Sequence, residues 1–283
     1  MVALLKEVTR HFGQLVTVNP IPYAPRRKTS QMDWLFPECR QLFPLRNESG
    51  VDKEMTTRLE LGALRYGLQR FGLLAAFAAV MFSVAGRWDW WRGWAFVIAA
   101  GLFEALTLAI LARRAPATLN ARGKAHTMTA WFDWLFAPLW LALSFATAIT
   151  AGLDVRRGVT ELPWTVFWVG VAVMAAASIL GAWAMLENEH FEQFVRIQDD
   201  RGHRVVDTGP YRLVRHPGYL AAIVGCLVGP LMLGTPRAFL PAGLMVVLFV
   251  WRTALEDRNL CRGLPGYTAY AQRTRKRLVP FLW

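Results

Sequence analysis

Residues 207–220, DTGPYRLVRHPGYL, concentrate side chains that can do chemistry directly before an apolar run. They include two prolines, two glycines, two tyrosines and one histidine. His216 can donate, accept or take up a proton near neutral pH. The aromatic faces of Tyr211 and Tyr219 can hold a cation or stack on a base. The same residues would also suit a turn that anchors a helix at a membrane surface, so this stretch alone leaves both interpretations open.

The order of these residues predicts a turn and then a helix. Gly209 and Pro210 favour the turn, and Thr208 is placed to cap the residues after it. Pro217 lacks an N–H group and therefore suits the first turn of a helix. The backbone N–H groups of that turn would favour an anionic group such as a carboxylate.

A second candidate is the stretch WRTALEDRNL, residues 251–260. Its Arg252 and Glu256 are four residues apart and lie on one face of a helix. They form either an ordinary ion pair at a helix end or two parts of a site. In the second case Arg252 would hold an anionic substrate and Glu256 would bind a cation or ribose hydroxyls.

Residues 188–211 connect an apolar run to the first candidate. Their pattern predicts an amphipathic helix at the start, a break at Gly202 and a short extended piece over 203–207. His190 has no acidic or histidine partner at metal-binding spacing, and the three cysteines lie far apart in the sequence. We therefore expect neither a metal site nor a disulfide framework.

Six apolar runs surround these candidates and predict the fold. They cover residues 66–86, 90–112, 134–153, 162–186, 219–234 and 238–251. A helix needs roughly 20 apolar residues to cross a bilayer, and the last two runs are shorter. The chain is 54% hydrophobic, with 13 tryptophans and 17 phenylalanines. We predict an all-α, polytopic membrane protein with about six transmembrane helices and a cytoplasmic C-terminal region that forms a pocket.

Charge gives the predicted orientation. The net charge is +12, and nineteen Lys and Arg residues fall on one side of the predicted membrane against five in the opposite loops. Cytoplasmic loops carry the excess of Lys and Arg, so both termini are expected in the cytoplasm. This distribution explains the basic charge without a nucleic-acid partner. Glu104, inside the second run, would be costly unless paired; it indicates either a helix–helix contact or a substrate path.

The chain divides into three predicted parts. Residues 1–54 hold five prolines and a basic cluster at 26–28 and show little periodicity; this is typical of a weakly ordered extension, or Met55 is the natural start. Residues 55–186 carry the first four membrane helices. Residues 187–283 carry both candidate stretches and the last two runs.

The C-terminal third resembles the isoprenylcysteine carboxyl methyltransferase family, in particular its bacterial integral-membrane members. The elements that carry the resemblance are GPYR, RHPGY, the acidic pair Glu256–Asp257, GY..Y and the RLVP..W end, in the family's order and spacing. It extends over about residues 191–283. Asp257 stands where some relatives have a second glutamate, and it keeps the carboxylate.

The resemblance implies a methyltransferase in a bacterial inner membrane that binds S-adenosyl-L-methionine on the cytoplasmic side. It implies an acceptor that is a lipophilic small molecule or lipid from the bilayer, with a carboxylate as the simplest methylated group, and it places Arg252 facing that acceptor. A carboxylate needs no general base, whereas an amine or thiol would use His216. The implied cofactor contacts are Gln198, His203, Arg204, Val205, Val206, Tyr211, His216, Pro217, Gly218, Tyr219 and Glu256.

Two other functions fit parts of the sequence. A membrane reductase of the sterol-reductase type shares an RHP.Y element and would use NADPH, but the fourth run lacks the further polar groups that a nicotinamide site needs. A transporter or membrane scaffold predicts polar or Gly/Pro-interrupted runs in matching halves, and only the fifth run shows an interruption.

Overall fold

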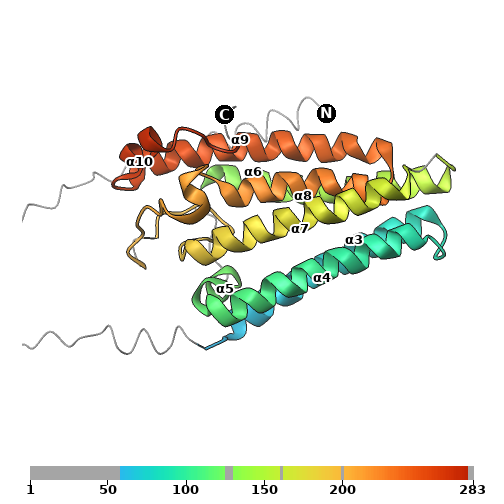
Figure 1. The fold of residues 1–283 in the computed structure, drawn as a ribbon, viewed down its shortest axis with the longest axis horizontal. Coiled ribbons are helices and arrows are strands. Elements are labelled where there is room, and N and C mark those ends of the chain that lie inside the picture. The colour runs from blue at the N-terminus through green and yellow to red at the C-terminus, as the bar shows by residue number, and fades with distance from the viewer. Residues whose placement is uncertain (1–57, 125–129, 160–161, 199–200, 280–283) are drawn as a thin grey trace, which may run out of the picture. The chain divides into compact units, whose positions relative to one another are not determined.

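Long apolar helices make up most of the structure, a computed structural model that describes residues 58–124, 130–159, 162–198 and 201–279. The extension predicted over residues 1–54 lies outside these ranges. The described residues form eight α-helices and two 3₁₀ helices and contain no strand (Figure 1). The all-α prediction is confirmed.

Six of these helices correspond to the six predicted runs. They are α3 (Leu61–Ala85), α4 (Trp91–Arg114), α6 (Trp131–Arg156), α7 (Trp164–Glu187), α8 (Pro217–Leu233) and α9 (Phe239–Gly263). Five are long and apolar enough to cross a membrane, and α8 is the shorter, sixth apolar helix. The described chain is therefore that of an integral membrane protein. Two short helices, α5 (Pro116–Arg122) and α10 (Tyr267–Arg273), complete the fold with the 3₁₀ turns η3 (Gly209–Arg212) and η4 (Pro236–Ala238).

The last helix extends beyond the apolar run that predicted it, as the helical placement of Arg252 and Glu256 requires. The apolar stretch stops near residue 251, but α9 continues to Gly263. The helix persists because Arg252 and Asp257, both buried, find charged partners on other elements. Hydropathy detects the apolar part of such a helix and misses the polar part.

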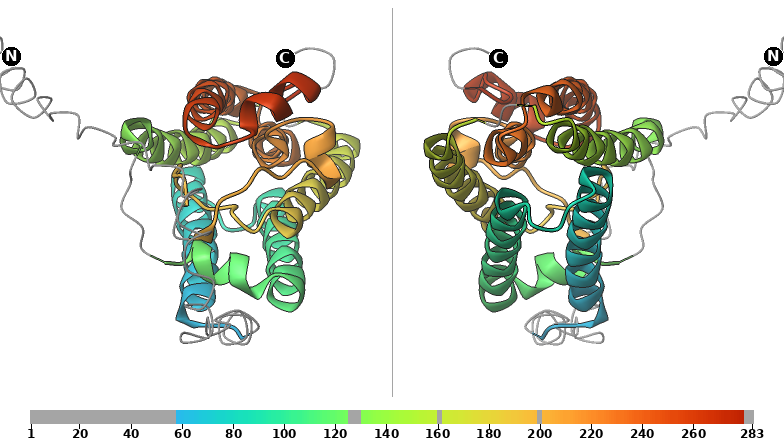
Figure 2. Two further views of the ribbon diagram at one scale, coloured as in Figure 1. Left: turned by 90° about the vertical axis from the view of Figure 1, so that its left-hand side faces the viewer. Right: turned by 90° about the vertical axis from the view of Figure 1, so that its right-hand side faces the viewer.

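The six long helices close into a ring. They follow one another round the ring in the order α3, α4, α7, α8, α9, α6 and back to α3, and α8 also contacts α4 and α6. Figure 2 shows this arrangement with the helices seen from their ends. Because the ring is closed, side chains from all six helices can face one interior.

Glycines and one asparagine permit the closest contacts beside α3. A Cβ on Gly152 of α6 would lie only 2.6 Å from the carbonyl oxygen of Met81. At the start of α3, the Asn120 side chain accepts a hydrogen bond from Glu60 N–H and donates one to the Arg58 carbonyl, both 2.9 Å long. These bonds fix α5 against the first turn of α3.

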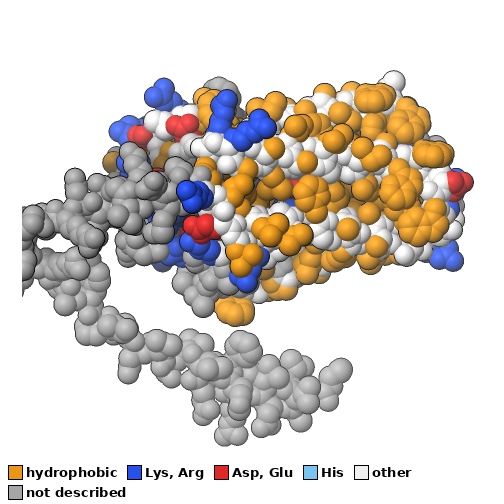
Figure 3. Space-filling model, turned by 90° about the horizontal axis from the view of Figure 1, so that it is seen from below, with side chains coloured by type: hydrophobic (Ala, Val, Ile, Leu, Met, Phe, Trp, Pro, Cys, Tyr) orange, Lys and Arg blue, Asp and Glu red, His pale blue; other side chains and the backbone are white. Residues whose placement is uncertain are grey.

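The ring has two unlike ends. We call one the basic end; it carries α5, the 188–216 segment and α10, and Lys and Arg side chains gather there (Figure 3). The other, here the far end, holds the turns 86–90 and 234–238 and a buried apolar cluster around Phe82, Trp90 and Met232. Between them the outer surface is a belt of exposed apolar side chains such as Leu68 and Ile179, as expected for contact with lipid.

An intramembrane ion pair joins the first two helices of the ring. Arg70 donates two hydrogen bonds to Glu104, of 2.9 and 2.8 Å. The pairing supplies the helix–helix contact that was one of the two interpretations of Glu104. Both residues also line the interior cavity.

Candidate functional site

A cavity of about 940 Å³ occupies the interior of the ring and reaches its basic end. Its wall includes residues of all six long helices and of the 188–216 segment. The sequence predicted a cofactor pocket in the C-terminal region, and in the structure α3, α4, α6 and α7 extend the same cavity beyond that region. All twelve predicted site residues line this one cavity: Gln198, His203, Arg204, Val205, Val206, Tyr211, His216, Pro217, Gly218, Tyr219, Arg252 and Glu256.

The entry of α8 agrees with the sequence prediction in part. Pro217 is its first residue and His216 its N-cap. Thr208 precedes η3 but makes no side-chain capping bond; its hydroxyl donates to the Glu187 carboxylate instead. The predicted Thr208 cap was therefore wrong, because a carboxylate at the end of α7 lies within reach of the hydroxyl.

The C-terminal segment is fixed to this entry through the backbone. Arg215 N–H donates to the carbonyl of Lys276 and His216 N–H to that of Arg277, each at 2.9 Å. The Arg215 guanidinium donates further bonds to the carbonyls of Thr274 and Arg275. The residues before α8 and those after α10 thus form one wall.

Asp257 is the centre of the buried polar network in that wall. Its carboxylate accepts two hydrogen bonds of 2.8 Å from Arg215. It also accepts one from Arg277, of 2.8 Å, and one from the Tyr267 hydroxyl, of 2.9 Å. His216 Nε2 lies 3.3 Å from the same carboxylate. From the sequence, Asp257 was only a carboxylate at a position where some relatives have glutamate. In the structure it connects Arg215, Arg277, Tyr267 and His216 at the basic end.

Glu256, the neighbour of Asp257, turns toward the cavity. The Tyr219 hydroxyl donates to one of its oxygens, and His216 Nδ1 lies 3.9 Å from the other. The His216 and Tyr219 rings stack nearly parallel, with centroids 5.7 Å apart. In the described part of the chain, no Lys or Arg comes within ion-pair distance of Glu256. Its negative charge is therefore available to a cationic ligand.

Arg252 does not pair with Glu256. Its guanidinium lies 2.7 Å from Asp133 on α6 and donates to the Gln193 carbonyl at 2.8 Å. It also lies over the Phe136 ring, 4.2 Å from the centroid. The i,i+4 ion pair considered from spacing is thus replaced by a contact between α9 and α6, which holds the guanidinium at the cavity wall.

The 188–216 segment crosses the basic end without the predicted amphipathic helix. Residues 188–198 are irregular, because their backbone groups bond to distant side chains. Val195 N–H donates to Asp133 at 2.7 Å, and the Gln193 carbonyl accepts from Arg252 at 2.8 Å. Tertiary hydrogen bonds replaced the helical ones that the periodicity favoured.

Buried Gln198 and His190 form a cluster with the half-buried His203. The Gln198 side chain donates to the His190 carbonyl at 2.7 Å and accepts from Arg201 at 2.9 Å. The His190 and His203 rings lie 4.5 Å apart, centroid to centroid. Burial lowers the pKa of His190, and burial together with the neighbouring His190 lowers the pKa of His203 to about 4. Both rings are therefore neutral at pH 7.

The remaining predicted contacts lie around Tyr211. Val205 and Val206 pack against the cluster that contains Tyr211, Tyr267 and Tyr270. The Tyr211 hydroxyl donates to the Ala184 carbonyl, and burial raises its pKa above the ordinary value. Arg204 makes an exposed ion pair of 3.0 Å with Glu189. Tyr211 thus presents its ring to the cavity wall while its hydroxyl fastens the wall to α7.

Several residues of the site have no role predicted from sequence. They include Asp133, Arg215, Arg122 and Phe191. Of these, Asp133 is the first acidic residue after the basic loop that precedes the third apolar run. That isolated carboxylate at the start of an apolar run was a usable signal. Its partner Arg252 was not deducible, because the two residues lie more than a hundred positions apart in the sequence.

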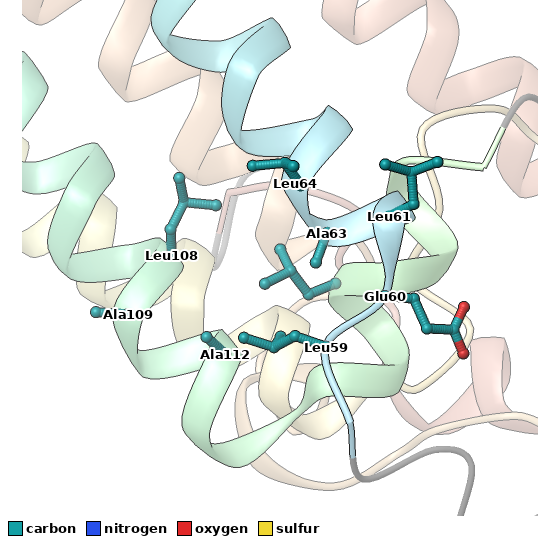
Figure 4. A pocket seen from close by; sticks show the side chains of 9 residues that line it. Leu59, Glu60, Leu61, Ala63, Leu64, Leu108, Ala109 and Ala112 are labelled. Atoms are coloured by element: carbon teal, nitrogen blue, oxygen red, sulfur yellow. The ribbon is translucent and has the colours of Figure 1, made fainter.

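A second hollow, of about 610 Å³, lies between the start of α3 and the last turns of α4 and is unsuited to chemistry (Figure 4). Its lining is leucine and alanine apart from Glu60, whose carboxylate points away from the cluster of Leu59 and Ala112. Such a surface suits contact with lipid chains. The candidate site is therefore the interior cavity.

Comparison with known proteins agrees with the motifs. The model of the isoprenylcysteine carboxyl methyltransferase (ICMT) family matches residues 168–262. This region is ICMT-like. The resemblance predicted from the sequence is confirmed, and the matched region contains α8, most of α9 and all twelve predicted site residues.

Two curated relatives share the similarity. They are the probable protein-S-isoprenylcysteine O-methyltransferases of Oryza sativa subsp. indica and subsp. japonica, each 26% identical over 122 residues. The alignment covers 42% of this chain and 63% of each relative. Helices α3, α4 and α6 lie before the ICMT-like region and contribute to the same cavity.

Proposed function

We propose that this protein is an integral-membrane methyltransferase that uses S-adenosyl-L-methionine and methylates a lipophilic acceptor, with carboxylate O-methylation as the simplest reaction. The observation that carries the proposal is the placement of Glu256, Tyr219 and His216 at a cavity that continues into the apolar ring. The ICMT-like region supports it, because it supplies this end of the cavity.

The residues present suit the methyl donor. S-adenosyl-L-methionine supplies an electrophilic methyl group on a sulfonium. Glu256 lacks a Lys or Arg partner among the described residues and would hold a cationic or hydroxyl group of the donor. The first turn of α8 would receive its carboxylate, and the ring of Tyr219 offers an aromatic face. Gln198, His203, Arg204, Val205, Val206, Tyr211, Pro217 and Gly218 would complete the donor site.

The acceptor would occupy the part of the cavity inside the ring. That part is lined by apolar side chains, including Leu74 and Phe77 of α3 and Phe103 of α4, so it suits a lipid-like chain. Arg252 would face the acceptor, oriented by Asp133. Methyl transfer then depends on alignment and exclusion of water. With an amine or thiol acceptor, His216 would take the proton at Nδ1 while Asp257 orients the ring through Nε2.

Membrane orientation forms part of the proposal. The basic end, with its excess of Lys and Arg, would face the cytoplasm of a bacterial cell. The donor would then enter from the cytoplasm and the acceptor from the bilayer.

Calorimetric titration of S-adenosylmethionine and S-adenosylhomocysteine into the detergent-purified protein tests the donor. We expect micromolar binding that Glu256→Ala abolishes. Glu60→Ala, which removes a carboxylate at the same end but outside the interior cavity, should leave binding unchanged. Binding of NADPH in place of either compound would favour the reductase, and binding of none of them by a folded sample would contradict the proposal.

A further inference from the structure

The arginines of the cavity wall differ in whether a carboxylate lies beside them and balances their charge. Six arginines line the cavity. Five of them lie within 4 Å of a carboxylate: Arg70 with Glu104, Arg196 with Glu192, Arg204 with Glu189, Arg215 with Asp257 and Arg252 with Asp133. Arg122, at the end of α5, has no carboxylate partner among the residues that the structure describes.

Aromatic rings hold Arg122 in place instead. Its guanidinium lies 4.8 Å from the centroid of the Tyr66 ring and 5.1 Å from that of Phe191. Two rings around a cation fix its orientation and leave its charge intact. The guanidinium makes one long hydrogen bond of 3.5 Å, to the Phe191 carbonyl.

Not every N–H group of the Arg122 guanidinium has a hydrogen-bond acceptor. Its Nε is buried and has no hydrogen-bond partner in the described part of the chain. Arg252 also has an unbonded Nε, but the charge of Arg252 is balanced by Asp133. A buried donor without an acceptor is rare in folded proteins. At Arg122 it coincides with an unbalanced positive charge, which is the combination expected where a ligand supplies an anionic acceptor.

Arg122 lies close to the proposed donor site. Phe191, which stacks on its guanidinium, packs against Gly218 in the first turn of α8 so closely that a Cβ there would collide with the ring. A single aromatic ring thus separates Arg122 from that turn. On the other side the cavity continues between α3 and α4 along apolar side chains such as Leu73 and Ala100.

We propose that Arg122 binds the anionic group, a carboxylate or a phosphate, of an amphiphilic ligand whose apolar chain extends into the ring. This proposal rests on the proposed function in one respect, since the ligand would be the methyl acceptor. Arg122 would give the acceptor its charge recognition, whereas the neutralised Arg252 would only orient it by hydrogen bonding. Arg122 lies before the ICMT-like region, so the specificity comes from a part of the chain outside the family match.

The first test compares anionic and neutral amphiphiles on the unaltered protein in a neutral maltoside detergent at pH 8. The probes are dodecyl phosphate, dodecanoate, dodecanol and inorganic phosphate, followed by tryptophan fluorescence and thermal unfolding. We expect both anionic amphiphiles to bind about tenfold or more tightly than dodecanol. Equal binding of dodecanol would overturn the proposal. Inorganic phosphate that binds as tightly as dodecyl phosphate would show a site for free anions and overturn the amphiphile assignment.

Variants then locate the effect. Arg122→Gln should abolish the preference for the anionic probes, and Arg122→Lys should keep part of it because the charge remains. Arg114→Gln, which removes an exposed arginine of α4 that does not line the cavity, should change nothing. A preference that survives in Arg122→Gln would contradict the proposal, and if that variant fails to fold, Arg122→Met, which also removes the charge and keeps much of the apolar stem, decides by the same comparison.

Donor titration separates this inference from the proposed function. S-adenosylhomocysteine should bind equally well to the unaltered protein and to Arg122→Gln. If it binds to neither, while the anionic preference is present and depends on Arg122, the methyltransferase proposal fails and the anion site stands. If it binds to both and no preference exists, the reverse holds.

Discussion

Each end of the helix ring buries an arginine, and the two arginines are satisfied in different ways. At the far end, Arg92 donates to backbone carbonyls at the end of α8, with Met232 O at 2.7 Å and Leu231 O at 3.3 Å. At the basic end, Arg215 makes a two-fold contact with the Asp257 carboxylate. Arg215 lines the cavity, and Arg92 does not.

The two contacts serve different purposes: the one at the far end closes the ring, and the one at the basic end positions residues at the cavity. Carbonyls at a helix C-terminus carry partial negative charge, so they attract a cation. The far-end contact ties α4 to α8 beside an apolar cluster and so closes the ring. At the basic end Asp257 is shared by Arg215, Arg277, Tyr267 and His216, so the same network that stabilises the fold also positions the residues at the cavity.

Asp257→Ala should have the largest effect on stability. It leaves Arg215 and Arg277 without their carboxylate, and loss of one partner of a buried ion pair costs about 3–5 kcal/mol. Thermal unfolding in detergent measures it. Asp207→Ala breaks the exposed pair of Asp207 and Arg273, 2.7 Å long, and should cost about 1 kcal/mol or less. Similar losses in both variants would mean that the basic end is no more than a set of surface contacts.

Arg92→Met tests the far end. Several carbonyls lose a donor while the apolar volume is kept, so we expect a loss of about 2–3 kcal/mol in the free energy of unfolding. Affinity for S-adenosylhomocysteine, measured calorimetrically at a temperature where the variant is folded, should not change. A variant of normal stability with weakened donor binding would reverse the assignment of roles to the two ends.

Gly218→Ala tests how tightly the basic end is packed. The new Cβ would collide with the Phe191 ring, and overpacking of this kind costs about 1–3 kcal/mol. Thermal unfolding should show the loss, and Phe191→Leu in the same chain should recover part of it. If Gly218→Ala is as stable as the unaltered protein, Phe191 can move and does not define the wall.

The histidine pair at the basic end predicts how the stability of the protein depends on pH. The pKa of His203, lowered to about 4 from the ordinary value of 6.5, means that the folded protein favours the neutral ring. This stability is present above about pH 6.5 and is lost as the pH falls from 6.5 toward 4. Allowing for the partly exposed ring, we expect a loss of about 1 kcal/mol. Melting temperatures between pH 7 and about pH 4 measure it, and His203→Gln should show a smaller decline; an equal decline would assign it to other groups.

Sequence alone determined the elements of this protein. Hydropathy predicted the six apolar helices, Pro217 predicted the start of α8, and short motifs indicated the family. These signals are local, since helix formation and hydrophobic burial depend on residue types a few positions apart. The same motifs selected twelve residues that the fold brings to one cavity, although their roles stay predictions.

Only the tertiary structure decided which charges pair and which remain unbalanced. Asp133 of α6 pairs with Arg252 of α9, and Asp257 pairs with Arg215. Residues 188–198 form hydrogen bonds to distant side chains in place of the predicted helix. Among the described residues no carboxylate balances the charge of Arg122, because aromatic rings contact its guanidinium instead. Such partners are set by the packing of helices far apart in the sequence, which no local pattern of residues encodes.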